Sequence, residues 1–266
     1  MLRASCLITY RESQSKERRE NLLAVLGWLA GVAGIETIVV EQDAAPTLGA
    51  DLAPAGARVV FAHNPGAFNK GWGLNVAARS AQAPVLALGD ADVLAPGGFE
   101  AALEACLRDA DAAKPYRRIV DLTPEESARV CAGAWDVVPE RPADAPPDRQ
   151  AQGEHVSFGG GLFLVRRDLF GRLGGFDERF RGWGGEDDAM TLKLARSGAR
   201  LVELGERPAL HLWHPRAHEA TFGQPHYEAN RALLAEYAAY GNAELKRLCE
   251  VGRQLAGNAD KYRAAP

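Results

Sequence analysis

The chain has 266 residues, of which 47% are hydrophobic and 25% are charged, a composition that predicts a soluble globular protein with one large α/β domain, alone or with an appendage. A net charge of −4 argues against general binding of polyanions, and so against nucleic acid as a partner. The four cysteines form no CxxC motif and no Cys/His pair, which argues against a zinc site or a disulfide framework.

The sequence shows no pattern of a targeting segment. No apolar run reaches the length of a transmembrane helix, and no signal-peptide pattern precedes the first predicted strand. We therefore expect a cytoplasmic protein without a transmembrane segment. A composition rich in Ala, Gly and Arg is typical of bacterial proteins. The sequence does not predict the oligomeric state.

The first half of the chain alternates strands and helices. The first helix is predicted to bury Leu22, Leu23, Leu26 and Leu29 on one face. The expected elements are a strand at 2–10, a helix at 15–30, strands at 35–42 and 57–62, a helix at 76–81, a strand at 84–88 and a helix at 99–113. The strand at 35–42 is almost wholly apolar, which favours a parallel sheet covered on both faces. This spacing is typical of a doubly wound α/β fold.

The second half is less regular. Thr123 is predicted to cap a helix that starts at Pro124. The run at 139–147, rich in proline, is expected to be a mobile loop, either an acceptor lid or a plain insertion. The later elements are a strand at 157–165 entered through three glycines, helices at 169–173 and 189–197, strands at 199–204 and 209–214, and a terminal helix pair at 227–255.

Two motifs follow predicted strands in the first half. Asp90-Ala91-Asp92 comes directly after the strand at 84–88, and ligands bind at the carboxyl ends of strands in open α/β sheets. Two carboxylates in such a turn can hold Mg²⁺ or Mn²⁺, although acidic turns are often only solvated. Upstream, the segment 64–75 combines an aromatic, Phe68, with a cation, Lys70, before a helix. It fits a base and a phosphate, or an ordinary helix entry capped by Asn69.

The most distinctive stretch is Arg181-Gly182-Trp183-Gly184-Gly185-Glu186-Asp187-Asp188. Glycines allow the backbone to approach a ligand closely. The three carboxylates open a helix, where they can bind a metal, act as a base or bind sugar hydroxyls. Acidic residues at a helix start also complement the helix dipole without any further role. The second acidic pair, at Asp90 and Asp92, favours the functional interpretation.

Four of the six histidines lie between residues 211 and 226. His211 and His214 stand at the end of a predicted strand, and metal ligation by at least one of them is favoured because the chain has a candidate cation site. On a regular strand the two side chains would point to opposite faces, so both can ligate only where the backbone turns between them.

These motifs resemble those of the GT-A glycosyltransferases, most of all the β-1,4-galactosyltransferase-like and glycosyltransferase family 2 group. Chondroitin polymerases and polypeptide N-acetylgalactosaminyltransferases are relatives in that group. The resemblance covers residues 3–215, and its most specific part runs from Phe158-Gly159-Gly160 to Asp188. It implies a Rossmann-like α/β domain with a mixed, mostly parallel sheet flanked by helices. The implied domains are a catalytic domain at 1–226, with a nucleotide-binding half at 1–95 and an acceptor half at 96–226, and a helical appendage at 227–266.

The resemblance also implies a set of donor contacts. Those nearest the nucleotide would come from the first strand and the segment at 64–75, and those nearest the sugar from the glycine run and the loop before the acidic helix. The implied donor-binding residues are Thr9, Tyr10, Arg11, Phe68, Lys70, Asp90, Gly159, Gly160 and Trp183. Ser13 replaces an arginine of the galactosyltransferases, and 114–158 matches poorly, where acceptor choice would be decided.

For the chemistry, the resemblance implies that Asp187 is the catalytic base and that Glu186 holds sugar hydroxyls. Asp92 and His214 would ligate Mn²⁺ (or Mg²⁺), with His211 as a second, weaker ligand. The expected function is metal-dependent transfer of a sugar from a UDP-sugar to a glycan or other hydroxyl acceptor, with inversion. The alternatives are a retaining transferase on the same fold and a binding module without catalysis.

Overall fold

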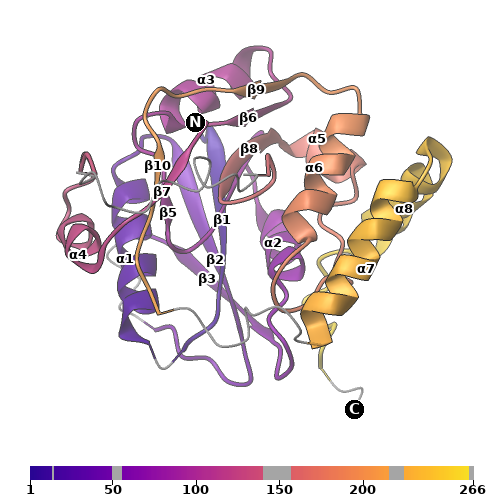
Figure 1. The fold of residues 1–266 in the computed structure, drawn as a ribbon, viewed down its shortest axis with the longest axis horizontal. Coiled ribbons are helices and arrows are strands. Elements are labelled where there is room, and N and C mark those ends of the chain that lie inside the picture. The colour runs from indigo at the N-terminus through magenta and orange to yellow at the C-terminus, as the bar shows by residue number, and fades with distance from the viewer. Residues whose placement is uncertain (14, 50–55, 140–156, 216–224, 264–266) are drawn as a thin grey trace.

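The computed structural model describes the chain except for residues 14, 50–55, 140–156, 216–224 and 264–266. A seven-stranded sheet with the order β3-β2-β1-β4-β8-β6-β9 forms the centre, and helices flank it (Figure 1). β8 is antiparallel to both of its neighbours, and the other pairs are parallel. Its strands are β1 Ala4–Tyr10, β2 Ile35–Asp43, β3 Arg58–His63, β4 Val85–Gly89, β6 Ala112–Lys114, β8 Leu162–Arg166 and β9 Leu201–Glu203. This arrangement confirms the predicted mixed, mostly parallel α/β fold.

A second, small sheet lies beside the first. It has the order β5-β10-β7, from β5 Val93–Leu94, β10 Ala209–His211 and β7 Ile119–Asp121. β10 pairs antiparallel with β5 and parallel with β7. β5 follows the end of β4 almost directly in the chain. The small sheet joins β5 and β7 to β10, which lies about a hundred residues further along the chain.

Two apolar clusters lie on the two faces of the large sheet. One packs α1 (Lys16–Ala30) and α3 (Phe99–Arg108) on the sheet, with α4 (Pro124–Cys131) against α1. The other includes residues of α2 (Lys70–Ser80), α5 (Arg167–Arg172) and α6 (Glu186–Arg196). Leu22, Leu26 and Leu29 are buried as predicted, whereas Leu23 is 37% exposed, and its place in the core is taken by Val25 and Trp28.

Two predicted helices have different bounds in the structure. α2 begins at Lys70 rather than at 76, since Asn69 caps it by accepting from the backbone N–H of Trp72. Its glycines suggested a loop, but Gly73 lets α2 pack closely on β1, where a Cβ would lie 2.1 Å from Thr9 Oγ1. The helix predicted at 99–113 ends at Arg108, because Ala112–Lys114 pairs with β8 and β9 as strand β6. Sheet pairing here overrides the helix propensity of alanine.

Several other predicted elements are shortened. Strand β8 begins only at Leu162, since the glycine run before it forms a turn, and β9 and β10 have three residues each. The predicted cap of α4 is confirmed, because Thr123 and Glu126 form a capping box. The predicted loop at 139–147 falls almost entirely outside the described residues. Along the described ranges, no helix is both long and apolar enough to cross a membrane.

The C-terminal helices α7 (Pro225–Ala239) and α8 (Asn242–Leu255) pack on the outside of α6 and α5 (Figure 1). A small apolar cluster of Phe180, Ala189, Tyr237 and Leu245 joins α7 and α8 to α6 and the loop before it. The tail after α8 returns to α2, where Tyr262 packs edge-on against Trp72 with ring centroids 4.8 Å apart. The C-terminal segment is therefore anchored on both halves of the chain.

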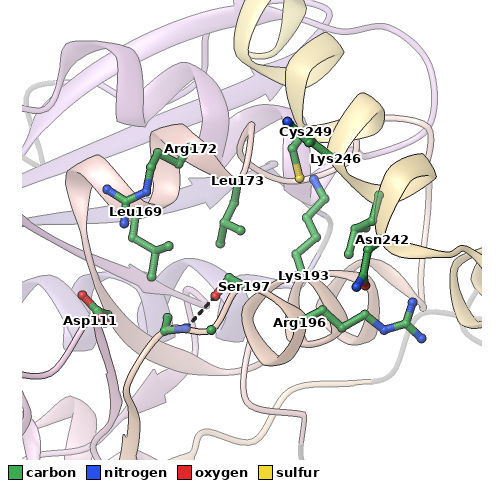
Figure 2. Close-up of a pocket in the computed structure, with 13 residues that line it drawn as sticks. Asp111, Leu169, Arg172, Leu173, Lys193, Arg196, Ser197, Asn242, Lys246 and Cys249 are labelled. Atoms are coloured by element: carbon green, nitrogen blue, oxygen red, sulfur yellow. Dashed lines mark hydrogen bonds between the residues drawn. The ribbon is translucent and has the colours of Figure 1, made fainter.

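A cavity of about 340 Å³ lies between α5, α6 and α8 (Figure 2). Four cations line it, and two of them, Lys193 and Arg196, are bound to carbonyl groups of the surrounding backbone. Lys193 Nζ donates to the carbonyl of Gly175 at 2.8 Å, and Arg196 donates to the carbonyls of Ala238 and Tyr240. The Arg196 contacts satisfy carbonyls at the end of α7, so the cavity marks a helix junction.

Candidate active site

The small sheet brings three metal-ligating side chains together. Asp92 directly precedes β5, and His211 ends β10, where it pairs with Val93. The ligand atoms of Asp92, His211 and His214 all lie within 4.8 Å of one another. His214 Nε2 is 3.2 Å from Asp92 Oδ2, and His211 Nε2 is 3.7 Å from Asp92 Oδ1. One carboxylate and two imidazoles form a donor set that suits Mn²⁺.

Both histidines reach Asp92 because the chain leaves its strand geometry after His211. β10 ends there, so the opposite-face rule for a regular strand does not apply to His214. The backbone of Trp213, between them, is held on both sides. Its N–H donates to Ser127 Oγ at 2.8 Å, and its carbonyl accepts from Asn21 Nδ2 at 3.1 Å. These contacts fix the turn that carries His214.

The charges of this cluster are mutually stabilising. Burial alone would raise the pKa of Asp92, but the neighbouring His211 and His214 outweigh it and lower that pKa. The hydrogen bond with Asp92 raises the pKa of His214. The ionised carboxylate is the state that ligates a metal, and a metal ion that binds here displaces the proton that Asp92 favours on His214.

A second cluster forms at the N-terminus of α6, around Lys70. Lys70 Nζ lies 2.9 and 3.0 Å from the two carboxylate oxygens of Asp187, and 2.7 Å from Asp90 Oδ1. Asp90 is only two residues before Asp92 in the chain, so it connects this cluster to the candidate metal site. Two carboxylates, of Asp90 and Asp187, therefore contact one ammonium group, and Glu186 lies close enough to raise the pKa of Lys70 as well.

Burial shifts the protonation of these groups. It raises the pKa of Asp187, although the charge of Lys70 opposes the shift. Burial and the charge of Asp187 raise the pKa of Glu186. Among the described residues, the buried Oε2 of Glu186 finds no hydrogen-bond partner. A buried acceptor without a partner is costly, and a ligand hydroxyl is a group that would satisfy it.

The glycine run lies against the same cluster. A Cβ on Gly160 would be 3.0 Å from Asp187 Oδ2, and a Cβ on Gly159 would be 2.9 Å from the Asp187 carbonyl. The backbone of Gly161 accepts from the N–H of Asp90 at 2.8 Å. The structure thus brings together Gly159, Gly160, Asp90 and Asp187, as the sequence motifs predict for one site.

Sequence reasoning missed the two residues that hold this run from below. Lys114, at the end of β6, is 1% exposed, and its Nζ donates to the carbonyls of Ser157 and Gly160. Burial lowers the pKa of Lys114 to about 8. The Tyr116 hydroxyl donates to the Gly160 carbonyl and accepts from the Leu162 N–H, both at 3.0 Å. The neighbours of Lys114 in the sequence, two alanines before it and Pro115 after it, gave no signal of this role.

Trp183 stands on a loop that α7 holds in place. Its ring is 56% exposed and stacks on Tyr227, with centroids 5.6 Å apart. Gly182, Gly184 and Gly185 all have positive φ, which only glycine adopts readily. Asn230, 3% exposed, donates to the carbonyls of Arg181 and Trp183 and accepts from the Arg181 N–H. Asn230, which fixes the backbone of the Trp183 loop, is a further residue that the sequence did not indicate.

The residues predicted to contact the nucleotide base divide into two groups. Thr9 and Tyr10 have buried side chains, with Thr9 Oγ1 bonded to Gln42 and the Tyr10 hydroxyl bonded to Glu12. Their side chains are buried, so a contact of Thr9 and Tyr10 with a ligand would come from their backbone groups. Arg11 donates to the backbone carbonyls of Gln42, Asn64 and Gly66, and its guanidinium lies 5.8 Å from the ring centre of Phe68.

The comparisons with known proteins agree with this geometry. Residues 148–215 match the sequence model of a family described as N-terminal domain of galactosyltransferase. Mouse chondroitin sulfate N-acetylgalactosaminyltransferase 1 is 30% identical over 153 residues, and mouse polypeptide N-acetylgalactosaminyltransferase 4 is 29% identical over 102 residues. These alignments cover 57% and 38% of this chain, but only 28% and 17% of the two relatives.

Solved structures establish the fold. The catalytic domain of Drosophila β1,4-galactosyltransferase 7, in complex with xylobiose, superimposes with a TM-score of 0.52 and 19% identity, covering 87% of this chain and 80% of that one. GalNAc-T7, solved with UDP, GalNAc and Mn²⁺, gives a TM-score of 0.57 at 16% identity, covering 94% of this chain and 54% of that one. The chain therefore has the fold of the GT-A glycosyltransferases, and parts of its sequence are similar to galactosyltransferases and N-acetylgalactosaminyltransferases.

Proposed function

We propose that the chain transfers a sugar from a UDP-sugar to a hydroxyl group of a glycan or similar acceptor, with inversion at the anomeric carbon. The observation that carries this proposal is the pair of adjoining clusters. A metal-ligating set, Asp92 with His211 and His214, lies next to a half-buried carboxyl pair, Glu186 and Asp187. The relatives known to bind UDP-Gal or UDP with Mn²⁺ share this fold.

Asp92, His211 and His214 would hold Mn²⁺, and a bound Mn²⁺ would offset the negative charge that develops on the departing diphosphate. Asp187 accepts the proton of the acceptor hydroxyl. Its raised pKa suits a general base, because such a base works best with a pKa near the working pH. Glu186 accepts a hydroxyl hydrogen bond at its unpartnered oxygen and so orients the donor sugar.

Other residues would shape and close the site. Lys70 keeps Asp187 charged and in place through its 2.9 and 3.0 Å contacts. The glycines at 159–160 let the backbone lie directly against Asp187, since a Cβ on either would come within 3.0 Å of that residue. Trp183 offers an exposed aromatic face beside the α6 N-terminus, which suits the apolar face of a sugar ring and would exclude water. In this proposal residues 1–95 bind the nucleotide, 96–226 supply the acceptor side, and 227–266 are a helical appendage.

Inversion follows from the use of Asp187 as a base in a single displacement. A competing proposal is a retaining transferase on the same fold. A third is a module that binds a sugar nucleotide or a glycan without catalysis. An ionisable aspartate at the α6 N-terminus can take the proton of the acceptor hydroxyl, which favours the single displacement.

A thermal-shift panel tests the proposal, because a ligand that binds only the folded state raises its melting temperature. UDP, GDP and their sugars would each be added with and without Mn²⁺. We expect stabilisation by UDP or a UDP-sugar only when Mn²⁺ is present, and its loss in Asp92→Ala but not in the exposed control Asp136→Ala. With the donor known, NMR of the product shows its anomeric configuration. Retention would exclude the inverting mechanism, and no stabilisation by any nucleotide would exclude the donor site.

A further inference from the structure

We propose that Asp121 positions His211 and strengthens it as a metal ligand. His211 then binds the metal more tightly than the second, weaker ligand that the family resemblance implies. This inference rests on the metal site of the proposed function. Asp121 is a positioning residue in this proposal, because it acts through His211 and does not itself belong to the three-residue ligand set.

The small sheet fixes the contact between these two residues. β7 and β10 are parallel, and their register pairs Asp121 directly with His211. Beyond that pair, the Leu122 N–H donates to the His211 carbonyl at 2.9 Å, and the Leu212 N–H donates to the Asp92 carbonyl at 2.8 Å. One imidazole therefore lies between two carboxylates, each on a neighbouring strand or at its end.

The two ring nitrogens of His211 face different partners. Nδ1 is 2.7 Å from Asp121 Oδ1, and Nε2 is 3.7 Å from Asp92 Oδ1. An ionised carboxylate can only accept a hydrogen bond, so the proton of a neutral His211 is placed on Nδ1. The lone pair of Nε2 is then directed toward the metal ligands. Hydrogen bonds of this kind fix the tautomer and orientation of a ligating histidine and increase its basicity as a ligand.

His214 provides an internal comparison. Its Nδ1 lies 3.0 Å from the carbonyl of Pro215, and its Nε2 faces Asp92. Both histidines thus present the same nitrogen to the site, but His214 is supported by a neutral carbonyl and His211 by a charged carboxylate. Charged acceptors make the stronger hydrogen bonds, so Asp121 gives His211 the greater gain in electron donation.

The consequence is a preference for Mn²⁺ over Mg²⁺. Two imidazole nitrogens suit Mn²⁺ and the later transition metals, whereas Mg²⁺ prefers oxygen ligands. Loss of Asp121 should weaken Mn²⁺ binding by roughly 10-fold to 100-fold, which is the usual effect of removing such a partner. Binding of Mg²⁺, which depends less on imidazole, should change much less.

The first test needs no metal. Long-range ¹H–¹⁵N NMR of the metal-free wild-type protein at about pH 8, where an ordinary histidine is neutral, reports the tautomer of His211. We expect Nδ1–H in the wild type and in Asp121→Asn, whose amide oxygen still accepts. In Asp121→Ala the population of Nε2–H should rise. An Nε2–H tautomer in the wild-type protein would overturn the inference even if the metal site is real.

The second test is titration of Mn²⁺ by calorimetry and by the EPR signal of the free ion. We expect Asp121→Ala to bind Mn²⁺ at least about 10-fold more weakly, with Asp121→Asn between it and the wild type. Glu125→Gln, which removes an equal charge from an exposed position four residues further on, should bind as the wild type does. Thermal unfolding in EDTA checks that each variant is folded.

A double-mutant cycle decides whether Asp121 acts through His211. In a His211→Ala background, Asp121→Ala should have no further effect on Mn²⁺ affinity. An equal loss in both backgrounds, or no loss in Asp121→Ala, would refute the proposed role. If the wild-type protein itself binds no Mn²⁺, the metal site of the proposed function fails instead, and the tautomer measurement still judges the contact.

Discussion

Replacement of Lys70 by methionine tests the electrostatic design of the carboxylate cluster. Methionine keeps most of the apolar stem but removes the ammonium group, which is 2.7 Å from Asp90 and 2.9 Å from Asp187. Burial lowers the pKa of Lys70, but the charges of Asp187, Asp90 and the half-buried Glu186 outweigh it and raise that pKa. The variant therefore leaves three carboxyl groups without their common cation.

Each of these two ion pairs corresponds to about 6 kcal/mol of Coulomb attraction at an effective dielectric constant of about 20. Desolvation of the ammonium group offsets much of that sum, and partial exposure of Asp90 and Asp187 screens the rest. Removal of one partner of a fully buried pair costs about 3–5 kcal/mol, and because these pairs are partly exposed we expect a loss at the lower end, about 3 kcal/mol. For a domain of this size, such a loss lowers Tm by about 10 °C.

The loss should depend on pH, and its direction follows from proton binding. Without Lys70 the folded-state pKa of Asp187 rises further above that of the unfolded chain, so the folded state binds more protons. Stability is then fully present at low pH and falls as pH rises through the raised folded-state pKa. We expect Lys70→Met to be much less stable than the wild type at about pH 8 and close to it at about pH 5.

The assay is thermal unfolding of both proteins in EDTA across that pH range, with Lys246→Met as an exposed control. Lys246 lies on α8 and makes none of these contacts, so its replacement should change Tm little at any pH. A deficit in Lys70→Met that is the same at every pH would mean lost packing rather than lost charge, and would refute the reasoning. So would a variant as stable as the wild type at about pH 8.

Three further predictions concern the reaction and the Trp183 loop. Asp187→Asn should lower the transfer rate by about 10²-fold to 10⁴-fold, while calorimetry shows unchanged binding of UDP-sugar with Mn²⁺; a rate within about 3-fold of the wild type would exclude Asp187 as the base. The base must be ionised, and burial raises the pKa of Asp187. As pH is lowered, the wild-type transfer rate should therefore begin to fall well above the ordinary aspartate pKa of about 3.9. In Lys70→Met this fall should begin at a still higher pH. Asn230→Ala removes hydrogen bonds of 2.8, 3.1 and 3.3 Å from the loop at 181–183, at a cost of about 1–3 kcal/mol. Hydrogen exchange should quicken in that loop but not in the exposed control Asn242→Ala, and unchanged exchange would show that Asn230 does not hold it.

Local patterns in the sequence were enough to predict most of the fold. Buried apolar runs gave β1, β2 and β4 within two residues, and Thr123 marked the start of α4. The failures came where tertiary contacts outweigh local preference. Gly71 and Gly73 suggested a loop but lie inside α2, because α2 packs closely on β1. Ala112 and Ala113 suggested a helix but form β6, because β8 and β9 pair with them.

By itself, the sequence determined the kind of fold and the chemical groups of the candidate site. Carboxylates after a buried strand and at a helix start, and histidines at a strand end, are local features, and each could be recognised from its neighbours in the chain. The tertiary structure decided which of these groups meet. It placed Lys70 between Asp90 and Asp187, turned both histidines toward Asp92, and set Asp121 behind His211. Those contacts depend on strand register and helix packing between segments far apart in the chain, and no local pattern encodes that register.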